Sequence, residues 1–140
     1  MSFYFDASVL VAAIVEEPGS AAARTTLRRP AGEIIIGAFA AAEVAAAVSR
    51  GFRIGRFTEA EARSALEDMD ALRVAGVNFA PAPDTIELAA HMARDFATKL
   101  LASDALHLAS AVEAGATLVT FDRRLAAAAM KFGIDVVVPG

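Results

Sequence analysis

Short apolar segments that predict strands alternate along this chain with longer segments that predict helices. The clearest strand is residues 33–37, EIIIG, because β-branched residues favour an extended backbone. Strands that are separated by helices pair in parallel, and a parallel sheet needs helices on both of its faces. The sequence therefore predicts an α/β fold, a three-layer α/β/α domain around a parallel sheet of about five strands.

Five segments are expected to be strands, and the segments between them are expected to be helices. The expected strands are residues 3–6, 33–37, 77–80, 117–121 and 135–138. The expected helices are residues 7–17, 20–29, 39–52, 59–72, 84–99, 104–113 and 123–132. Thr58 and Glu61 have the spacing of a capping box, and Ser103 is expected to cap the helix that follows it.

The composition limits the class of protein. A chain of 140 residues is long enough for one domain, residues 1–140, and too short for two. It contains no cysteine, which excludes disulfides and thiolate metal sites. No apolar run approaches the length of a membrane span, and the first residues lack the positive charge that begins a signal peptide. We therefore expect a cytoplasmic protein that does not enter a membrane.

Four acidic residues stand out because each follows an apolar run or lies near the start of a helix. They lie in the segments FYFDAS, AAAEVAAA, LLASDALHLAS and LVTFD, as Asp6, Glu43, Asp104 and Asp122. Parallel strands end at one edge of a sheet, so these carboxylates are expected to meet there. Carboxylates about 4 Å apart repel by roughly 4 kcal/mol at an effective dielectric constant of about 20, so such a cluster needs cations.

Mg2+ and Mn2+ are the expected cations, because both prefer hard oxygen ligands. One or two such ions would activate water and neutralise the charge that develops on a phosphate group. The sequence therefore predicts metal-dependent hydrolysis of phosphodiesters. The net charge of −4 does not argue against a nucleic-acid substrate, because the four acids account for the whole excess of 17 acidic over 13 basic residues.

Each of these acids also has an ordinary structural interpretation. Asp6 could cap a helix, and Glu43 could form a single buried ion pair. Asp104 and Asp122 could be first-turn or capping acids of the helices that they begin. His107 shares a helix face with Asp104, but a lone histidine there is expected to be packed core rather than a catalyst or a ligand. The functional interpretation therefore depends on all four acids meeting at one edge.

Hydroxyl groups and arginines lie near the four acids in the sequence. Ser8 follows Asp6 by two residues and Thr120 precedes Asp122 by two, so each could orient water or phosphate, or bond to the backbone. The arginines near the expected edge are Arg50, Arg53, Arg56, Arg123 and Arg124. They could bind backbone phosphates, or they could simply be solvated surface residues.

One expected helix carries almost no polar residues. Residues 39–48 are apolar nearly all round, whereas a surface helix normally has a single apolar stripe. Burial on two sides would indicate a dimer or partner interface, with Phe52 and Phe57 as anchors. The alternative is that this helix lies at the centre of the core.

Three long segments resemble the PIN-domain family, and in particular the VapC-type toxins of bacterial and archaeal toxin–antitoxin pairs. FYFDASVLVAAIVEEPGS is similar to the family's first strand, first acid and following helix. AAAEVAAAVSRGFRIGRFTEAEA is similar to the helix of the second acid and the hairpin after it. ASDALHLASAVEAGATLVTFDRRLAAAAMKFGIDVVVP is similar to the segment that holds the third and fourth acids and the last strand. The resemblance covers essentially the whole chain.

The resemblance implies a Mg2+- or Mn2+-dependent endoribonuclease that forms a homodimer and is inhibited by a cognate antitoxin. It assigns the catalytic and metal-binding roles to Asp6, Glu43, Asp104 and Asp122. It gives supporting roles to the hydroxyls of Ser8 and Thr120. After EIII, many relatives have Ser or Thr where this chain has Gly37, so one helper hydroxyl is expected to be missing.

Two other functions compete with the nuclease. A haloacid-dehalogenase-like phosphatase also has an aspartate after its first strand, but it needs a second aspartate two residues later, where this chain has Ser8. A PIN-like module that only binds a partner would typically have lost one of the acids, and all four are present. Nuclease activity therefore remains the favoured interpretation.

Overall fold

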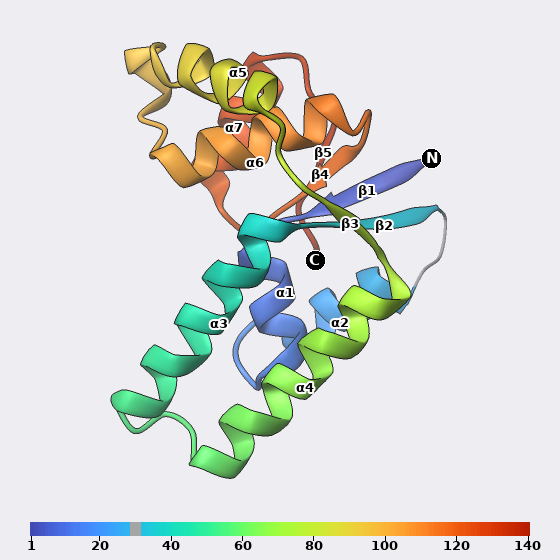
Figure 1. Cartoon of the computed structure of the whole chain (residues 1–140), viewed down its shortest axis with the longest axis vertical. Helices are drawn as coiled ribbons and strands as arrows, with labels where there is room; N and C mark the ends of the chain where they lie inside the picture. The colour runs from blue at the N-terminus through green and yellow to red at the C-terminus, as the bar shows by residue number, and fades with distance from the viewer. Residues whose placement is uncertain (29–31) are drawn as a thin grey trace.

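Five parallel strands form the central sheet of the computed structural model, which describes residues 1–28 and 32–140 (Figure 1). Their bounds are β1 (Ser2–Phe5), β2 (Glu33–Gly37), β3 (Val77–Phe79), β4 (Thr117–Val119) and β5 (Val136–Val137). The order across the sheet is β3-β2-β1-β4-β5, and every pair of neighbours is parallel. The expected fold class, with five parallel strands, is confirmed.

Seven α-helices lie on the two faces of the sheet in the described part of the chain. They are α1 (Ala7–Ile14), α2 (Ser20–Arg28), α3 (Ala38–Arg53), α4 (Glu59–Ala75), α5 (Pro83–Ala93), α6 (Ala102–Glu113) and α7 (Arg123–Lys131). Helices α1–α4 lie on one side of the sheet and α5–α7 on the other (Figure 1). The end expected for α2, Arg29, lies outside the described residues.

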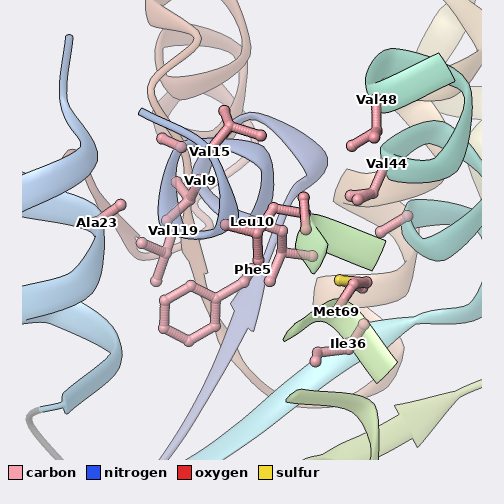
Figure 2. Packing of buried hydrophobic residues seen from close by; sticks show 14 of the residues in the cluster. Phe5, Val9, Leu10, Val15, Ala23, Ile36, Val44, Val48, Met69 and Val119 are labelled. Atoms are coloured by element: carbon pink, nitrogen blue, oxygen red, sulfur yellow. The ribbon is translucent and has the colours of Figure 1, made fainter. Parts of the chain in front are cut away.

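Alternation along the central strands sends side chains into two separate cores, because successive residues of a strand point to opposite faces. Phe5 and Ile36 pack with the helices α1–α4 (Figure 2). Tyr4 and Ile35 pack with α5–α7 on the other face. The sheet is therefore covered on both sides, as the near-continuous apolar character of β1 and β2 requires.

Helix α3 is buried along one stripe rather than on two sides. Ala40, Val44, Val48 and Gly51 are the buried residues, and they lie three or four positions apart along the helix. The alanines on the rest of α3 are largely exposed to solvent. The helix therefore does not lie at the centre of the core, and it presents an alanine-rich face on the surface of the single chain.

Several expected element ends differ from the structure. The helix expected over residues 84–99 ends at Ala93, and a short 3-10 helix, η1 (Phe96–Thr98), follows it. The Asp95 side chain accepts a hydrogen bond from the Ala97 backbone N–H at 3.2 Å and so caps this new turn. Ser103 is not the cap of α6: the helix begins at Ala102, two residues earlier than expected, and its N-cap is Leu101. No helix of the described residues has the length and apolar character to cross a membrane.

Candidate active site

Asp6 lies at the topological switch point of the sheet. The chain leaves β1 towards β2 and β3 and later returns to the other side of β1 as β4, so the crevice between β1 and β4 is open at the carboxyl edge. Asp6 follows β1 there and is also the N-cap of α1, because its Oδ1 accepts from the Val9 backbone N–H at 3.2 Å. The backbone of Asp6 therefore joins the end of β1 to the start of α1.

The carboxylate of Asp6 is buried and held by hydroxyl groups. Ser8 Oγ donates to its Oδ1 at 2.6 Å, and Thr120 Oγ1 donates to its Oδ2 at 2.5 Å. Only 4% of Asp6 is exposed. Burial raises the pKa of this carboxyl, although the hydrogen bonds from Ser8 and Thr120 oppose the rise. The site therefore keeps an acid in a fixed orientation where ionisation is costly.

The same two hydroxyls join the ends of β1 and β4. Thr120 Oγ1 also accepts from the Asp122 backbone N–H at 2.9 Å, and Ser8 Oγ accepts from the Phe121 backbone N–H at 3.0 Å. Residues that are more than one hundred positions apart in the sequence are thus locked together across the crevice. The hydroxyls of Ser8 and Thr120, which the sequence placed near Asp6 and Asp122, both donate a hydrogen bond to Asp6.

Glu43 reaches this edge from α3 and contacts His107 on α6. His107 Nε2 is hydrogen-bonded to Glu43 Oε1, and Nδ1 of the same ring lies 2.9 Å from the Tyr4 hydroxyl. The ring of His107 is 3% exposed and also packs against Phe39, with the ring centroids 5.9 Å apart. The expectation that His107 is buried core is correct, but its contact with Glu43 was not predicted from the sequence. The sequence indicated only that His107, three residues after Asp104, lies on the same helix face as that acid.

Asp104 and Asp122 act as helix caps. Asp104 Oδ2 accepts from the Leu101 backbone N–H at 3.0 Å, and Asp122 Oδ1 accepts from the backbone N–H groups of Arg124 and Leu125 at 2.9 and 3.1 Å. Asp104 is half-buried and Asp122 is exposed. The ordinary structural interpretation of both residues is therefore correct as far as these contacts go. Each carboxylate keeps a second oxygen outside these capping bonds.

Among the described residues, the four acids do not form one close cluster: Glu43 lines a depression, and Asp6 lies beside it through its contact with Ser8. The lining of this depression is Ala7, Ser8, Val11, Glu17, Pro18, Glu43, Ala47 and Phe121. Within residues 1–28 and 32–140, no group of three or more acidic or histidine side chains is arranged so that it could hold a metal ion. The oxygen donors nevertheless fit Mg2+ or Mn2+, because Mg2+ needs only one or two direct carboxylates.

A second depression lies further along α3. It is lined by Ala46, Ala47, Arg50, Gly51, Arg53, Ile54 and Arg56. Ala47 lines both depressions, so Glu43 and these arginines adjoin on one surface. Arg56 lies 3.4 Å from Glu17 of the first depression, and Arg53 donates to Ser49 Oγ at 2.7 Å. Arg123 and Arg124 are exposed in the first turn of α7, directly after Asp122.

Solved structures of other proteins have a similar fold. VapC20 of Mycobacterium tuberculosis, described as a Sarcin-Ricin loop cleaving toxin, is 18% identical and gives a TM-score of 0.73 over 90% of this chain and 94% of its own. VapBC2 of Rickettsia felis, bound to a promoter DNA fragment, is 16% identical, with a TM-score of 0.72 over 100% of both chains. FitAB bound to the IR36 DNA fragment is 17% identical, with a TM-score of 0.74 over 98% of this chain and 94% of its own.

These likenesses establish the fold, and the sequence itself identifies the family. No curated protein sequence matches this chain. The profile of the PIN domain family matches residues 3–131, which include all four acids and, apart from Ser2 of β1, every strand except β5. The chain belongs to the PIN domain family.

Proposed function

We propose that this protein is an endoribonuclease that hydrolyses RNA phosphodiesters with Mg2+ or Mn2+ and acts as the toxin of a toxin–antitoxin pair. The observation that carries the proposal is the Asp6 carboxylate, buried at the switch point, oriented by two hydroxyls and placed beside the depression that Glu43 lines. Membership of the PIN domain family and the fold shared with the toxin VapC20 support it.

The proposed metal ligands and catalytic groups are Asp6, Glu43, Asp104 and Asp122. Bound Mg2+ or Mn2+ would supply an activated water and would neutralise charge on the scissile phosphate. Ser8 and Thr120 have a supporting role, because their hydroxyls already fix both oxygens of Asp6. Asp104 and Asp122 each have an oxygen outside their capping bonds, and these oxygens are the proposed metal ligands.

The reaction adds water across one phosphodiester bond of RNA. The water oxygen forms a bond to phosphorus, and the bond between phosphorus and O3′ breaks. The downstream product keeps the phosphate on its O5′, and O3′ of the upstream product takes a proton. Arg50 and Arg53 are proposed to bind backbone phosphates on one side of the cut, since their depression adjoins that of Glu43. Arg123 and Arg124 are proposed to bind phosphates next to Asp122.

A cognate antitoxin and a second copy of the chain are the proposed protein partners. The exposed alanine face of α3 continues into Phe52 and Ile54, which are 45% and 61% exposed. Apolar surface of this kind is typical of an interface. Light scattering at micromolar concentration tests the homodimer, and a monomer there would contradict it.

Cleavage by purified, antitoxin-free protein tests the proposed activity. Asp104→Asn is compared with Asp84→Asn, because both residues are acids in the first turn of a helix and only Asp104 is proposed for the site. We expect Asp104→Asn and Asp6→Asn to lower kcat by at least about 100-fold and Asp84→Asn to leave it unchanged. Activity that survives both site substitutions, or no cleavage by the wild type in either metal, would refute the nuclease.

A non-catalytic PIN-like module is the alternative, and metal binding separates the two. Calorimetry of Mn2+ with the wild type and with Asp104→Asn measures whether the acids form a site in the absence of RNA. Binding that depends on Asp104 supports the catalyst. A wild type that binds no Mn2+ supports the binding module.

A further inference from the structure

Gly37 and the Tyr4 hydroxyl compete for one volume at the start of α3. Gly37 is the N-cap of α3, with φ −69° and ψ 140°, a conformation that any residue adopts. A Cβ atom at position 37 would lie 2.2 Å from the Tyr4 hydroxyl oxygen. Glycine is therefore required here by the close approach of Tyr4 and not by the backbone.

The Tyr4 hydroxyl uses this volume to reach His107. Tyr4 Oη lies 2.9 Å from His107 Nδ1, while His107 Nε2 contacts Glu43 Oε1. An ionised carboxylate only accepts hydrogen bonds, so Nε2 carries the hydrogen and donates it to Glu43. In the neutral ring Nδ1 then accepts from the Tyr4 O–H.

A chain of hydrogen bonds runs from Tyr4 through His107 to Glu43. Both nitrogens of His107 are engaged, and its ring packs against those of Tyr4 and Phe39, with centroid distances of 5.7 and 5.9 Å. His107 has no nitrogen free to bind a ligand. The Glu43 side chain, in contrast, is 29% exposed, so its carboxylate remains accessible from the depression that it lines.

We propose that His107 is a positioning residue: supported by the Tyr4 hydroxyl, it holds the Glu43 carboxylate in one orientation before metal or RNA arrives. The inference rests on the proposed function, since it concerns the same site. A glutamate held in advance loses less side-chain freedom when it binds a cation. Groups that hydrogen-bond to metal-binding carboxylates typically change metal affinity or activity by about 10- to 100-fold when they are removed.

Three substitutions separate the hydrogen bond from the shape of the side chain. His107→Leu fills the ring's place without a donor, whereas the amide of His107→Gln can still donate to Glu43. Tyr4→Phe removes only the hydroxyl behind the ring. Ile35→Val is the control, because it removes a buried methyl group from the same core without contacting Glu43. Thermal unfolding confirms that each variant folds.

The measurements are the Kd for Mn2+ by calorimetry, without RNA, and kcat and KM for RNA cleavage. We expect His107→Leu to weaken Mn2+ binding by about 10- to 100-fold and to lower kcat, with KM nearly unchanged. His107→Gln should recover most of that loss, Tyr4→Phe should lose less than His107→Leu, and Ile35→Val should match the wild type. If His107→Leu does not fold, the comparison of His107→Gln and Tyr4→Phe with Ile35→Val carries the test.

Two outcomes would overturn the inference in different ways. If the wild type binds Mn2+ and cleaves RNA while His107→Leu and Tyr4→Phe keep the wild-type Kd and kcat, the positioning role is wrong and the proposed function stands. The same conclusion follows if Ile35→Val loses as much as they do. If the wild type neither binds Mn2+ nor cleaves RNA, the proposed function and the inference fail together.

Discussion

Tyr4 and Gly37 give the most direct test at the scale of single residues. In Gly37→Ala, the new methyl group displaces the Tyr4 hydroxyl, so we expect a loss of about 1–3 kcal/mol in the free energy of unfolding. In the Tyr4→Phe background, the nearest remaining ring atom lies at 3.1 Å, and the loss should shrink. Urea unfolding of the four proteins measures the coupling. Equal losses in both backgrounds would show that the two residues do not compete for space.

Asp6 makes stability depend on pH, and the sign follows from its raised pKa. The folded protein holds the proton of Asp6 more tightly than the unfolded chain does. The contribution of Asp6 to the free energy of unfolding is therefore fully present below the pKa of the unfolded chain, and it is lost as pH rises through the pKa of the folded protein. In metal-free protein, we therefore expect Asp6→Asn to gain stability relative to the wild type as pH rises from about 4 to about 7. Parallel urea midpoints of the two proteins across that range would contradict this.

His107 shows why the residue scale is the hardest to predict. Its burial follows from the apolar face of the DALHLAS segment, which a local pattern encodes. Its bond to Glu43 joins residues 64 positions apart and depends on how α3 and α6 meet across the sheet edge. In the same way, the hydroxyl that the sequence suggested was missing at Gly37 has a counterpart in Tyr4, whose hydroxyl fills that place.

Helix α4 provides a test at the scale of elements, because its start was expected from sequence and is confirmed. Thr58 Oγ1 accepts from the Glu61 backbone N–H, and Glu61 Oε1 accepts from the Thr58 backbone N–H, both at 3.1 Å. Thr58→Ala removes one of these bonds and should cost about 1 kcal/mol of stability. Thr25→Ala, on the exposed middle of α2, is the matched control and should change stability by less than about 0.5 kcal/mol. Equal thermal shifts for both variants would contradict the capping role.

Elements with a local chemical cause were predictable, and those set by tertiary contacts were not. The capping box and the isoleucines of β2 identify their elements without reference to the rest of the fold. The end of α5 was missed because Asp95 caps η1 and also pairs with Lys131 of α7 at 2.8 Å, a contact that no local pattern encodes. The start of α6 was missed because Asp104, rather than Ser103, makes its capping bond.

At the scale of the whole molecule, the order of the strands assembles the site. The alternation of strands and helices predicted a parallel sheet but left the strand order open, and β3-β2-β1-β4-β5 places β1 in the middle. Asp6 therefore lies between the ends of β2 and β4. Asp6 contacts Thr120 at the end of β4, and Glu43 belongs to α3, the helix that follows β2. Residues that are distant in sequence meet at the ends of β1 and β4 because the chain reverses its direction of travel at β1.

A site built from separate elements should couple metal binding to global stability. Binding to the folded state alone raises the free energy of unfolding by about 2.7 kcal/mol when the ligand is at 100 times its Kd. We expect Mn2+ to raise the thermal midpoint of the wild type and of Asp84→Asn equally, because Asp84 lies outside the proposed site on α5. Asp6→Asn and Glu43→Gln should each lose most of the shift, since one proposed ligand comes from the end of β1 and the other from α3. A full shift in either variant would place the metal elsewhere on the protein.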